Sequence, residues 1–122
     1  MDIVLPLVAA DVDRYLRLQR PTFERHYADL GRTWLVTRPQ DLVDVRARAA
    51  GLDGVEIVDQ RDVVPEVVLT RELRFFRGRE QERNWSLQQL VKLATVAQLD
   101  SPFALLADAD VIAVARTNGN VA

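Results

Sequence analysis

The sequence predicts an α/β fold: a Rossmann-like three-layer α/β/α arrangement with a mostly parallel sheet of four to five strands. Short apolar runs rich in β-branched residues alternate with stretches of helical periodicity. The polar connections between them are short, as is typical of a parallel sheet covered by helices. At 122 residues the chain is expected to form one domain, residues 1–122, with a frayed tail at residues 116–122.

The first half of the chain reads as strand, helix, strand, helix, strand. The strands are expected at residues 3–7, 33–37 and 54–59. Asp11 is a candidate N-cap for the first helix, and Pro21 is expected to kink or break that helix because it lacks the backbone N–H. Pro39 marks the start of the second helix and Gly51 its end.

The second half gives one strong helix and two further strands. The pattern loosens at residues 60–83, which could hold a short helix or an irregular segment. Residues 84–99 form a strongly amphipathic pattern for which Asn84 is the expected cap. The apolar run at 101–108 predicts a fourth strand in the centre of the sheet, and residues 111–115 predict a short fifth.

Composition narrows the class of protein. Apolar residues make up 48% and charged residues 28% of the chain, which is typical of a globular domain. A net charge of -2 gives no reason to expect a nucleic-acid partner, and the absence of cysteine excludes disulfides and thiolate chemistry. No apolar run is long enough to span a bilayer, and the N-terminus does not resemble a signal peptide. We therefore expect a cytoplasmic protein. Its arginine-rich composition suggests a bacterial source.

Two carboxylates, Asp108 and Asp110, follow the predicted fourth strand. Ligands of open α/β sheets collect outside the carboxyl ends of the strands. If the backbone stays extended across Ala109, both side chains point to the same side and repel each other unless a cation lies between them. Mg²⁺ and Mn²⁺ prefer such oxygen ligands together with substrate phosphates. The plainer alternative is that Asp108 caps a loop and Asp110 points to solvent.

Three kinds of site use such a pair. A phosphatase of the haloacid dehalogenase type carries D-x-D after a strand, but normally at the start of its fold and with further acids and a lysine later. A dinucleotide-binding domain is disfavoured because no glycine-rich phosphate loop follows the first predicted strand. The remaining candidate is a nucleotide-sugar glycosyltransferase.

The stretch from Trp85 to Asp110, "WSLQQLVKLATVAQLDSPFALLADAD", resembles GT-A-type glycosyltransferases. In these enzymes, including the glycogenin-like retaining members, a helix carrying "KL" leads to a strand that ends in "DAD". More closely, the stretch resembles a family of bacterial glycosyltransferase-like proteins with W-x-x-QQ-x-x-KL before the same motif. The opening strand and helix also fit the start of that family.

The resemblance implies roles for individual residues. Asp108 and Asp110 would bind Mn²⁺ or Mg²⁺ and, through it, the diphosphate of a nucleoside diphosphate sugar. Lys92 would match the helix lysine that lies near the donor. Val8, Gln88 and Asp59 are weaker donor-site candidates, which the first strand, the helix and the third strand would place near the nucleotide.

The resemblance also implies what is missing. GT-A enzymes bind the acceptor through a second half that follows the D-x-D, whereas this sequence runs only to Ala122. We therefore expect the donor-binding half of a metal-dependent glycosyltransferase, incomplete for catalysis unless an acceptor-binding half is supplied. The alternative is a non-catalytic α/β interaction module, which would self-associate or pair with a partner.

Overall fold

The computed structural model describes residues 1–100 and 104–108 and contains a sheet of four parallel strands. These are β1 (Asp2–Pro6), β2 (Thr33–Thr37), β3 (Val55–Asp59) and β4 (Ala104–Leu106). Their order across the sheet is β3-β2-β1-β4, so β1 lies in the middle with β2 on one side and β4 on the other. In register, Leu5 lies opposite Leu35, and Leu35 opposite Ile57.

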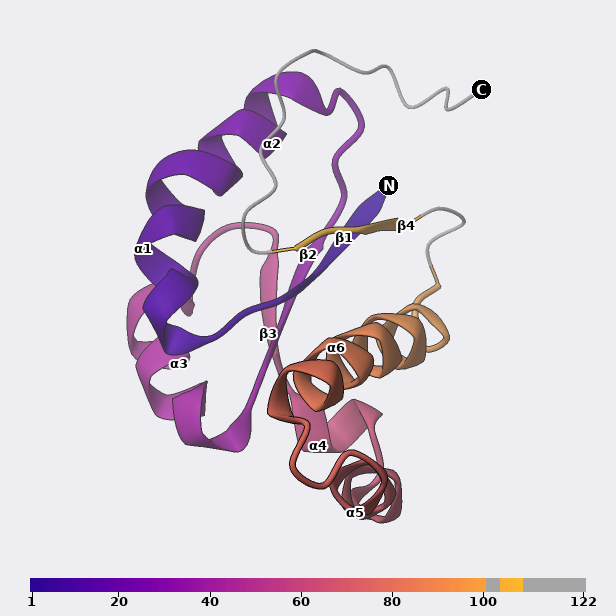
Figure 1. Cartoon of the computed structure of the whole chain (residues 1–122). Helices are drawn as coiled ribbons and strands as arrows, with labels where there is room; N and C mark the ends of the chain where they lie inside the picture. The colour runs from indigo at the N-terminus through magenta and orange to yellow at the C-terminus, as the bar shows by residue number, and fades with distance from the viewer. Residues whose placement is uncertain (101–103, 109–122) are drawn as a thin grey trace.

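One face of the sheet is covered by the helices of the first half (Figure 1). The first helical stretch consists of η1 (Ala9–Asp11), α1 (Val12–Arg14), η2 (Tyr15–Gln19) and α2 (Arg20–His26). The second consists of η3 (Pro39–Asp41) and α3 (Leu42–Ala49). Their apolar residues pack on the strands in a core centred on Ile3, Leu5, Tyr15, Phe23, Leu35 and Val45. As predicted, the second stretch begins at Pro39, and Gly51 follows it with a positive φ of 83°.

The other face is covered by α4 (Gln60–Val63), α5 (Glu66–Phe75) and α6 (Glu80–Val96). Val4 and Val36 point from the sheet into a second core, where they meet Val64 and Val91. Because β-strand side chains alternate between faces, Val4 serves this core while its neighbours Ile3 and Leu5 serve the other. The predicted three-layer α/β/α class with a parallel sheet is confirmed.

The chain reverses its direction across the sheet between β3 and β4. From β1 it moves outward through β2 to β3, and then α4, α5 and α6 carry it back past β1 to β4. Such a reversal of strand order creates a crevice outside the carboxyl ends of the two neighbouring strands at which it occurs. Here these strands are β1 and β4. Two hydrogen bonds extend the sheet beyond these ends, from Leu7 N to Val36 O (2.9 Å) and from Ala107 N to Val4 O (3.0 Å).

Of the two effects expected of Pro21, a kink or a break, the break does not occur. The helical path begins with η1 at Ala9 and continues past Pro21 to His26, and the turn just before Pro21 is a π-helical turn, residues Tyr15–Gln19. In that turn Arg20 N donates to Tyr15 O, five residues back. A π turn realigns the hydrogen-bond ladder and accommodates a residue that has no N–H to contribute.

Several predicted boundaries also shift. Asp11 makes no side-chain capping hydrogen bond, because the helical path already begins at Ala9. Asn84 is not a cap either, since α6 begins at Glu80. Residues 60–83 contain α4 and α5, and β4 ends at Leu106 rather than at the predicted Asp108. In the described sheet β4 pairs with β1 alone. The predicted fifth strand at 111–115 and the tail at 116–122 lie outside the described residues.

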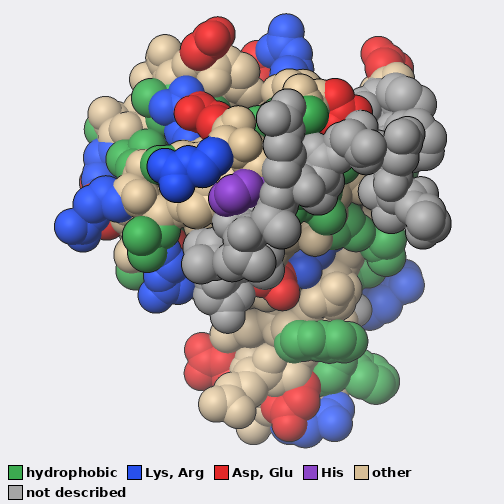
Figure 2. Space-filling model, turned by 90° about the horizontal axis from the view of Figure 1, so that it is seen from above, with side chains coloured by type: hydrophobic (Ala, Val, Ile, Leu, Met, Phe, Trp, Pro, Cys, Tyr) green, Lys and Arg blue, Asp and Glu red, His purple; other side chains and the backbone are tan. Residues whose placement is uncertain are grey.

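The surface seen in Figure 2 mixes basic and acidic side chains, and the single histidine, His26, lies on it. Among the described residues, none of the helices combines the length and apolarity that a bilayer crossing requires.

Candidate functional site

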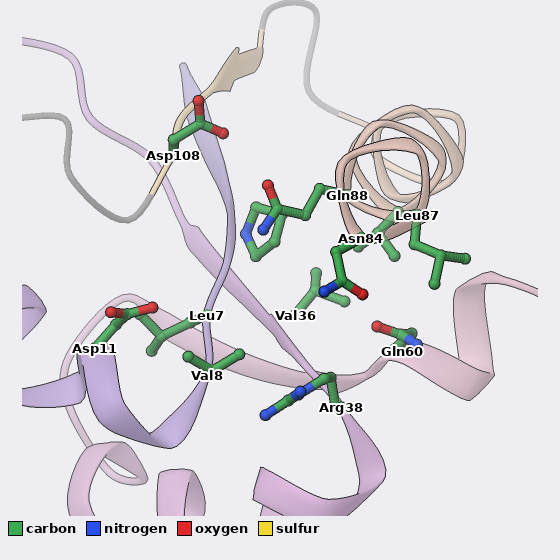
Figure 3. Close-up of a pocket in the computed structure, with 12 residues that line it drawn as sticks. Leu7, Val8, Asp11, Val36, Arg38, Gln60, Asn84, Leu87, Gln88 and Asp108 are labelled. Carbon is green, nitrogen blue, oxygen red and sulfur yellow. The ribbon is translucent and has the colours of Figure 1, made fainter. Parts of the chain in front are cut away.

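A cavity of about 200 Å³ lies at the carboxyl ends of β1 and β4, between the end of β1 and helix α6 (Figure 3). This is the switch point at which open α/β sheets bind their ligands. Pockets for whole small molecules usually measure about 300–1,000 Å³, so the described residues enclose room for part of a larger ligand.

The lining of the cavity divides into an apolar wall and a polar set. The apolar wall comes from the ends of β1 and β2 and from α6 and comprises Pro6, Leu7, Val8, Val36, Leu87 and Val91. The polar set carries charges of both signs and three amides and comprises Asp11, Arg38, Gln60, Asn84, Gln88 and Asp108. An apolar wall with a few polar groups is the usual make-up of a small-molecule site.

Asp108 is held by a lysine from the neighbouring helix. Lys92 lies on α6 with only 8% of its side chain exposed, and its Nζ contacts Asp108 Oδ1. The Asp108 side chain is 54% exposed, so one partner of this ion pair is buried and the other faces the cavity. A buried ammonium needs a partner, and this pairing fixes the orientation of the Asp108 carboxylate.

The backbone of Asp108 is held from the opposite face of the sheet. Gln19 is fully buried and its Nε2 donates to the Asp108 carbonyl oxygen at 2.9 Å. Gln19 is the last residue of the π-helical turn, so the local geometry that accommodates Pro21 also sets the position from which Gln19 reaches the strand end. π turns are frequent at functional sites.

Arg38 forms another part of the cavity, directly after β2. Its Nε donates to Asp41 Oδ2 at 2.7 Å, and Asp41 itself is only 8% exposed. The η3 turn brings these two residues together, since Asp41 N also donates to the Arg38 carbonyl. The guanidinium is thus oriented by a buried carboxylate while 46% of the arginine side chain stays exposed.

Asp59 has a structural role. It ends β3, accepts the backbone N–H of Arg61 at 2.9 Å as the N-cap of α4, and binds the Arg61 guanidinium through both carboxylate oxygens. The hydrogen bonds from Arg61 hold the pKa of Asp59 below its ordinary value, against the opposing effect of burial. Asp59 does not line the cavity.

The sequence-predicted donor residues therefore fall into four groups. Val8, Gln88 and Asp108 line one cavity, and Lys92 stands behind Asp108 rather than in the lining. Asp59 lies elsewhere, and Asp110 falls outside the described residues. Within residues 1–100 and 104–108, no group of three or more His, Cys, Asp or Glu side chains is placed to hold a metal ion.

Sequence reasoning missed Gln19, Arg38 and Asn84. Gln19 carried a usable signal, because it occupies the apolar stripe formed by Val12, Tyr15 and Phe23, where an amide must find a buried partner. For Arg38 the signal was its place directly after a strand. Asn84, the expected helix cap, instead extends from α6 toward the strands (Figure 3).

Comparison with known proteins gives a single family match. The model of a family of unknown function, DUF6492, matches residues 1–118. No curated protein matches the chain, and no solved structure does.

Proposed function

The chain belongs to DUF6492, a family of unknown function, and we propose from the site itself that the cavity binds the donor of a glycosyl transfer. The ligand is a nucleoside diphosphate sugar, held through a Mn²⁺ or Mg²⁺ ion at Asp108, with Asp110 as the second carboxylate of the sequence motif. The chain is thereby the donor-binding part of a metal-dependent glycosyltransferase.

The observation that carries this proposal is the position of Asp108. It follows β4 at the switch point of a parallel sheet and lines the cavity there. Three independent features support a ligand at that place: the reversal of strand order, the mixed polar and apolar lining, and two polar contacts that fix Asp108 by its side chain and its backbone.

The donor atoms at Asp108 fit a hard divalent cation that shares its coordination with phosphate. Lys92 contacts Oδ1, and the Asp108 side chain as a whole is 54% exposed, so water or a ligand can reach it. Mg²⁺ is commonly bound by one or two carboxylates, with water and substrate phosphate oxygens completing its shell. When bound, such a cation neutralises the charge that develops on a leaving diphosphate.

The chain's own residues have complementary tasks in this proposal. Lys92 keeps the Asp108 carboxylate oriented and is itself buried behind it. Gln88 and Asn84 extend from α6 as neutral groups that can donate to or accept from the polar parts of a nucleotide. Val8 and Leu7 supply apolar wall against which a flat ring can lie.

Calorimetry tests the proposal. Titration with UDP-, GDP-, ADP- and CDP-hexoses, with and without Mn²⁺, is expected to give saturable binding that requires the metal for at least one donor. Asp108→Asn is expected to abolish that binding. Asp44→Asn, an exposed position on α3 on the opposite side of the sheet, is the matched control and should bind as the unmodified chain does.

Loss of folding must be separated from loss of the site. The double variant Lys92→Met with Asp108→Asn removes both charges together and is expected to fold but not to bind. Binding that is independent of Mn²⁺, or that survives in a folded Asp108→Asn variant, would refute the proposal.

A second candidate function rests on α5 and the start of α6. Val67, Phe75 and Trp85 expose 66%, 69% and 67% of their surface, and the Arg79 guanidinium covers the Phe75 ring at 5.6 Å. Exposed aromatic and arginine side chains are enriched in protein interfaces. An interaction module would appear in sedimentation as a concentration-dependent dimer that Phe75→Ser abolishes, with no response to any nucleotide.

A further inference from the structure

The cavity has two chemically different ends. Figure 3 shows Asp108 at one end and Arg38 at the other, with Asn84 and Gln88 extending into the space between them. Gln60 lies on the Arg38 side. A ligand whose diphosphate is tethered to a cation at Asp108 therefore directs another of its parts toward Arg38.

Arg38 presents a preorganised fork to that part of the ligand. Its Nε is occupied by the buried Asp41 carboxylate at 2.7 Å, which fixes the plane of the guanidinium. Its Nη1 and Nη2 groups have no hydrogen-bond or ion-pair partner among the described residues. A guanidinium carries donors only, so a matching ligand group must offer acceptors.

We propose that Arg38 reads the nucleobase of the donor and selects bases with a keto oxygen at C4 of a pyrimidine or at C6 of a purine. This inference rests on the proposed function, because it places the diphosphate at Asp108 and hence the base near Arg38. Uracil and guanine combine a carbonyl acceptor with an adjacent ring N–H. The arginine fork donates to the carbonyl, and the amide oxygen of Gln60 or Asn84 accepts from the ring N–H.

The same geometry rejects cytosine and adenine. Both carry an amino group where uracil and guanine carry the keto oxygen, so a donor on the base would meet the donors of Arg38. A site built to hydrogen-bond one pattern discriminates against the opposite pattern because its polar groups are then left unpaired. In nucleic-acid recognition arginine contacts the same guanine O6, there together with N7 on the major-groove edge.

The test compares nucleotides that differ at this one group. Calorimetry with UDP against CDP and with GDP against ADP, all with Mn²⁺, isolates the keto-for-amino exchange. We expect UDP to bind about tenfold to a hundredfold more tightly than CDP, or GDP than ADP, the range of discrimination that one bidentate arginine contact supplies. Inorganic pyrophosphate with Mn²⁺ measures the diphosphate end alone.

Two variants and one control assign the effect to Arg38. Arg38→Met removes the fork and is expected to bring the UDP and CDP affinities together without changing pyrophosphate binding. Arg38→Lys keeps a cation beside Asp41 to protect folding and should lose the same selectivity. Arg61→Met breaks the similar pair with Asp59 at the end of β3, outside the cavity, and should leave the selectivity unchanged.

The outcomes separate this inference from the proposed function. Metal-dependent binding with equal affinity for UDP, CDP, GDP and ADP would overturn the role of Arg38 and leave donor binding intact. Loss of pyrophosphate binding in Arg38→Met would place the arginine on the diphosphate and also overturn the inference. Failure of the unmodified chain to bind any nucleotide or pyrophosphate would refute the proposed function and the inference with it.

Discussion

Removing the Asp108 carboxylate should destabilise the protein more than removing the Lys92 ammonium. The two partners differ in burial: 8% of the Lys92 side chain is exposed, against 54% for Asp108. Asp108→Ala therefore strands a buried cation, whereas Lys92→Met leaves a carboxylate that water can reach and keeps an apolar side chain of similar length in the core.

The difference in the loss of unfolding free energy between the two variants can be estimated from two limits, a fully buried and a fully exposed ion pair. Breaking a fully buried ion pair by removing one partner costs about 3–5 kcal/mol. Breaking an exposed pair costs about 0–1 kcal/mol. Because only the lysine is buried, we expect Asp108→Ala to cost about 2 kcal/mol and Lys92→Met to stay within about 1 kcal/mol. The double variant removes the stranded charge and should recover most of the loss.

Urea unfolding of the four proteins measures these free energies in one double-mutant cycle. The slope of the free energy against urea should stay constant, since the variants bury similar surface. Equal costs for the two single variants, or a double variant as unstable as Asp108→Ala, would refute the account in which the buried lysine depends on Asp108.

Three further outcomes are expected. Gln19→Met should lower the free energy of unfolding by about 1 kcal/mol, because it removes the partly buried hydrogen bond to the Asp108 carbonyl; an unchanged urea midpoint would contradict this. Since Arg61 lowers the pKa of Asp59, the stability that Asp59 contributes is present above its unfolded value near 3.8 and is lost as the pH falls through the lower folded value. Asp59→Asn should therefore flatten the acid side of a stability–pH profile, and an unaltered acid limb would show that this pair adds nothing. Burial raises the pKa of Tyr15 above 10.0, so its contribution is complete below pH 10 and is lost as the pH rises through the folded value. Above pH 10 the thermal unfolding temperature should thus fall more steeply with pH in the unmodified chain than in Tyr15→Phe. Parallel curves for the two proteins would contradict this.

The fold was largely predictable because its strands are buried on both faces. Runs such as 33–37 are apolar or β-branched throughout, which marks strands of a parallel sheet. The helix α5 was left open between a short helix and an irregular segment, because the continuous apolar run Val67, Val68 and Leu69 obscures the period of the helix around it. A break was expected at Pro21 because the missing N–H of a proline usually ends or kinks a helix. Here a π turn accommodates the proline and the helix continues.

The site was predictable only where it lies in one stretch of sequence. Asp108 follows an apolar run and Gln88 lies on the preceding helix, so both were accessible to motif reasoning. Arg38 belongs to the site because β2 lies beside β1 in the sheet, and no local pattern around residue 38 encodes that neighbour. Sites of open α/β sheets are assembled from the ends of several strands, so strand order must be known before their full lining can be named.

The burial of Lys92 allows chemical labelling of this one residue to report on the end of β4. Lys92 is the only lysine in the sequence, as the other fifteen of its sixteen Lys and Arg residues are arginine. Acylation of a lysine ε-amine can therefore occur only at Lys92. That side chain is buried in contact with Asp108, which shields it from the reagent. The rate at which an amine-reactive reagent modifies Lys92, followed by mass spectrometry, measures how often the end of β4 separates from α6. Any molecule that seals that junction will slow the labelling, so a collection of compounds can be screened for ligands while the reaction is still to be identified.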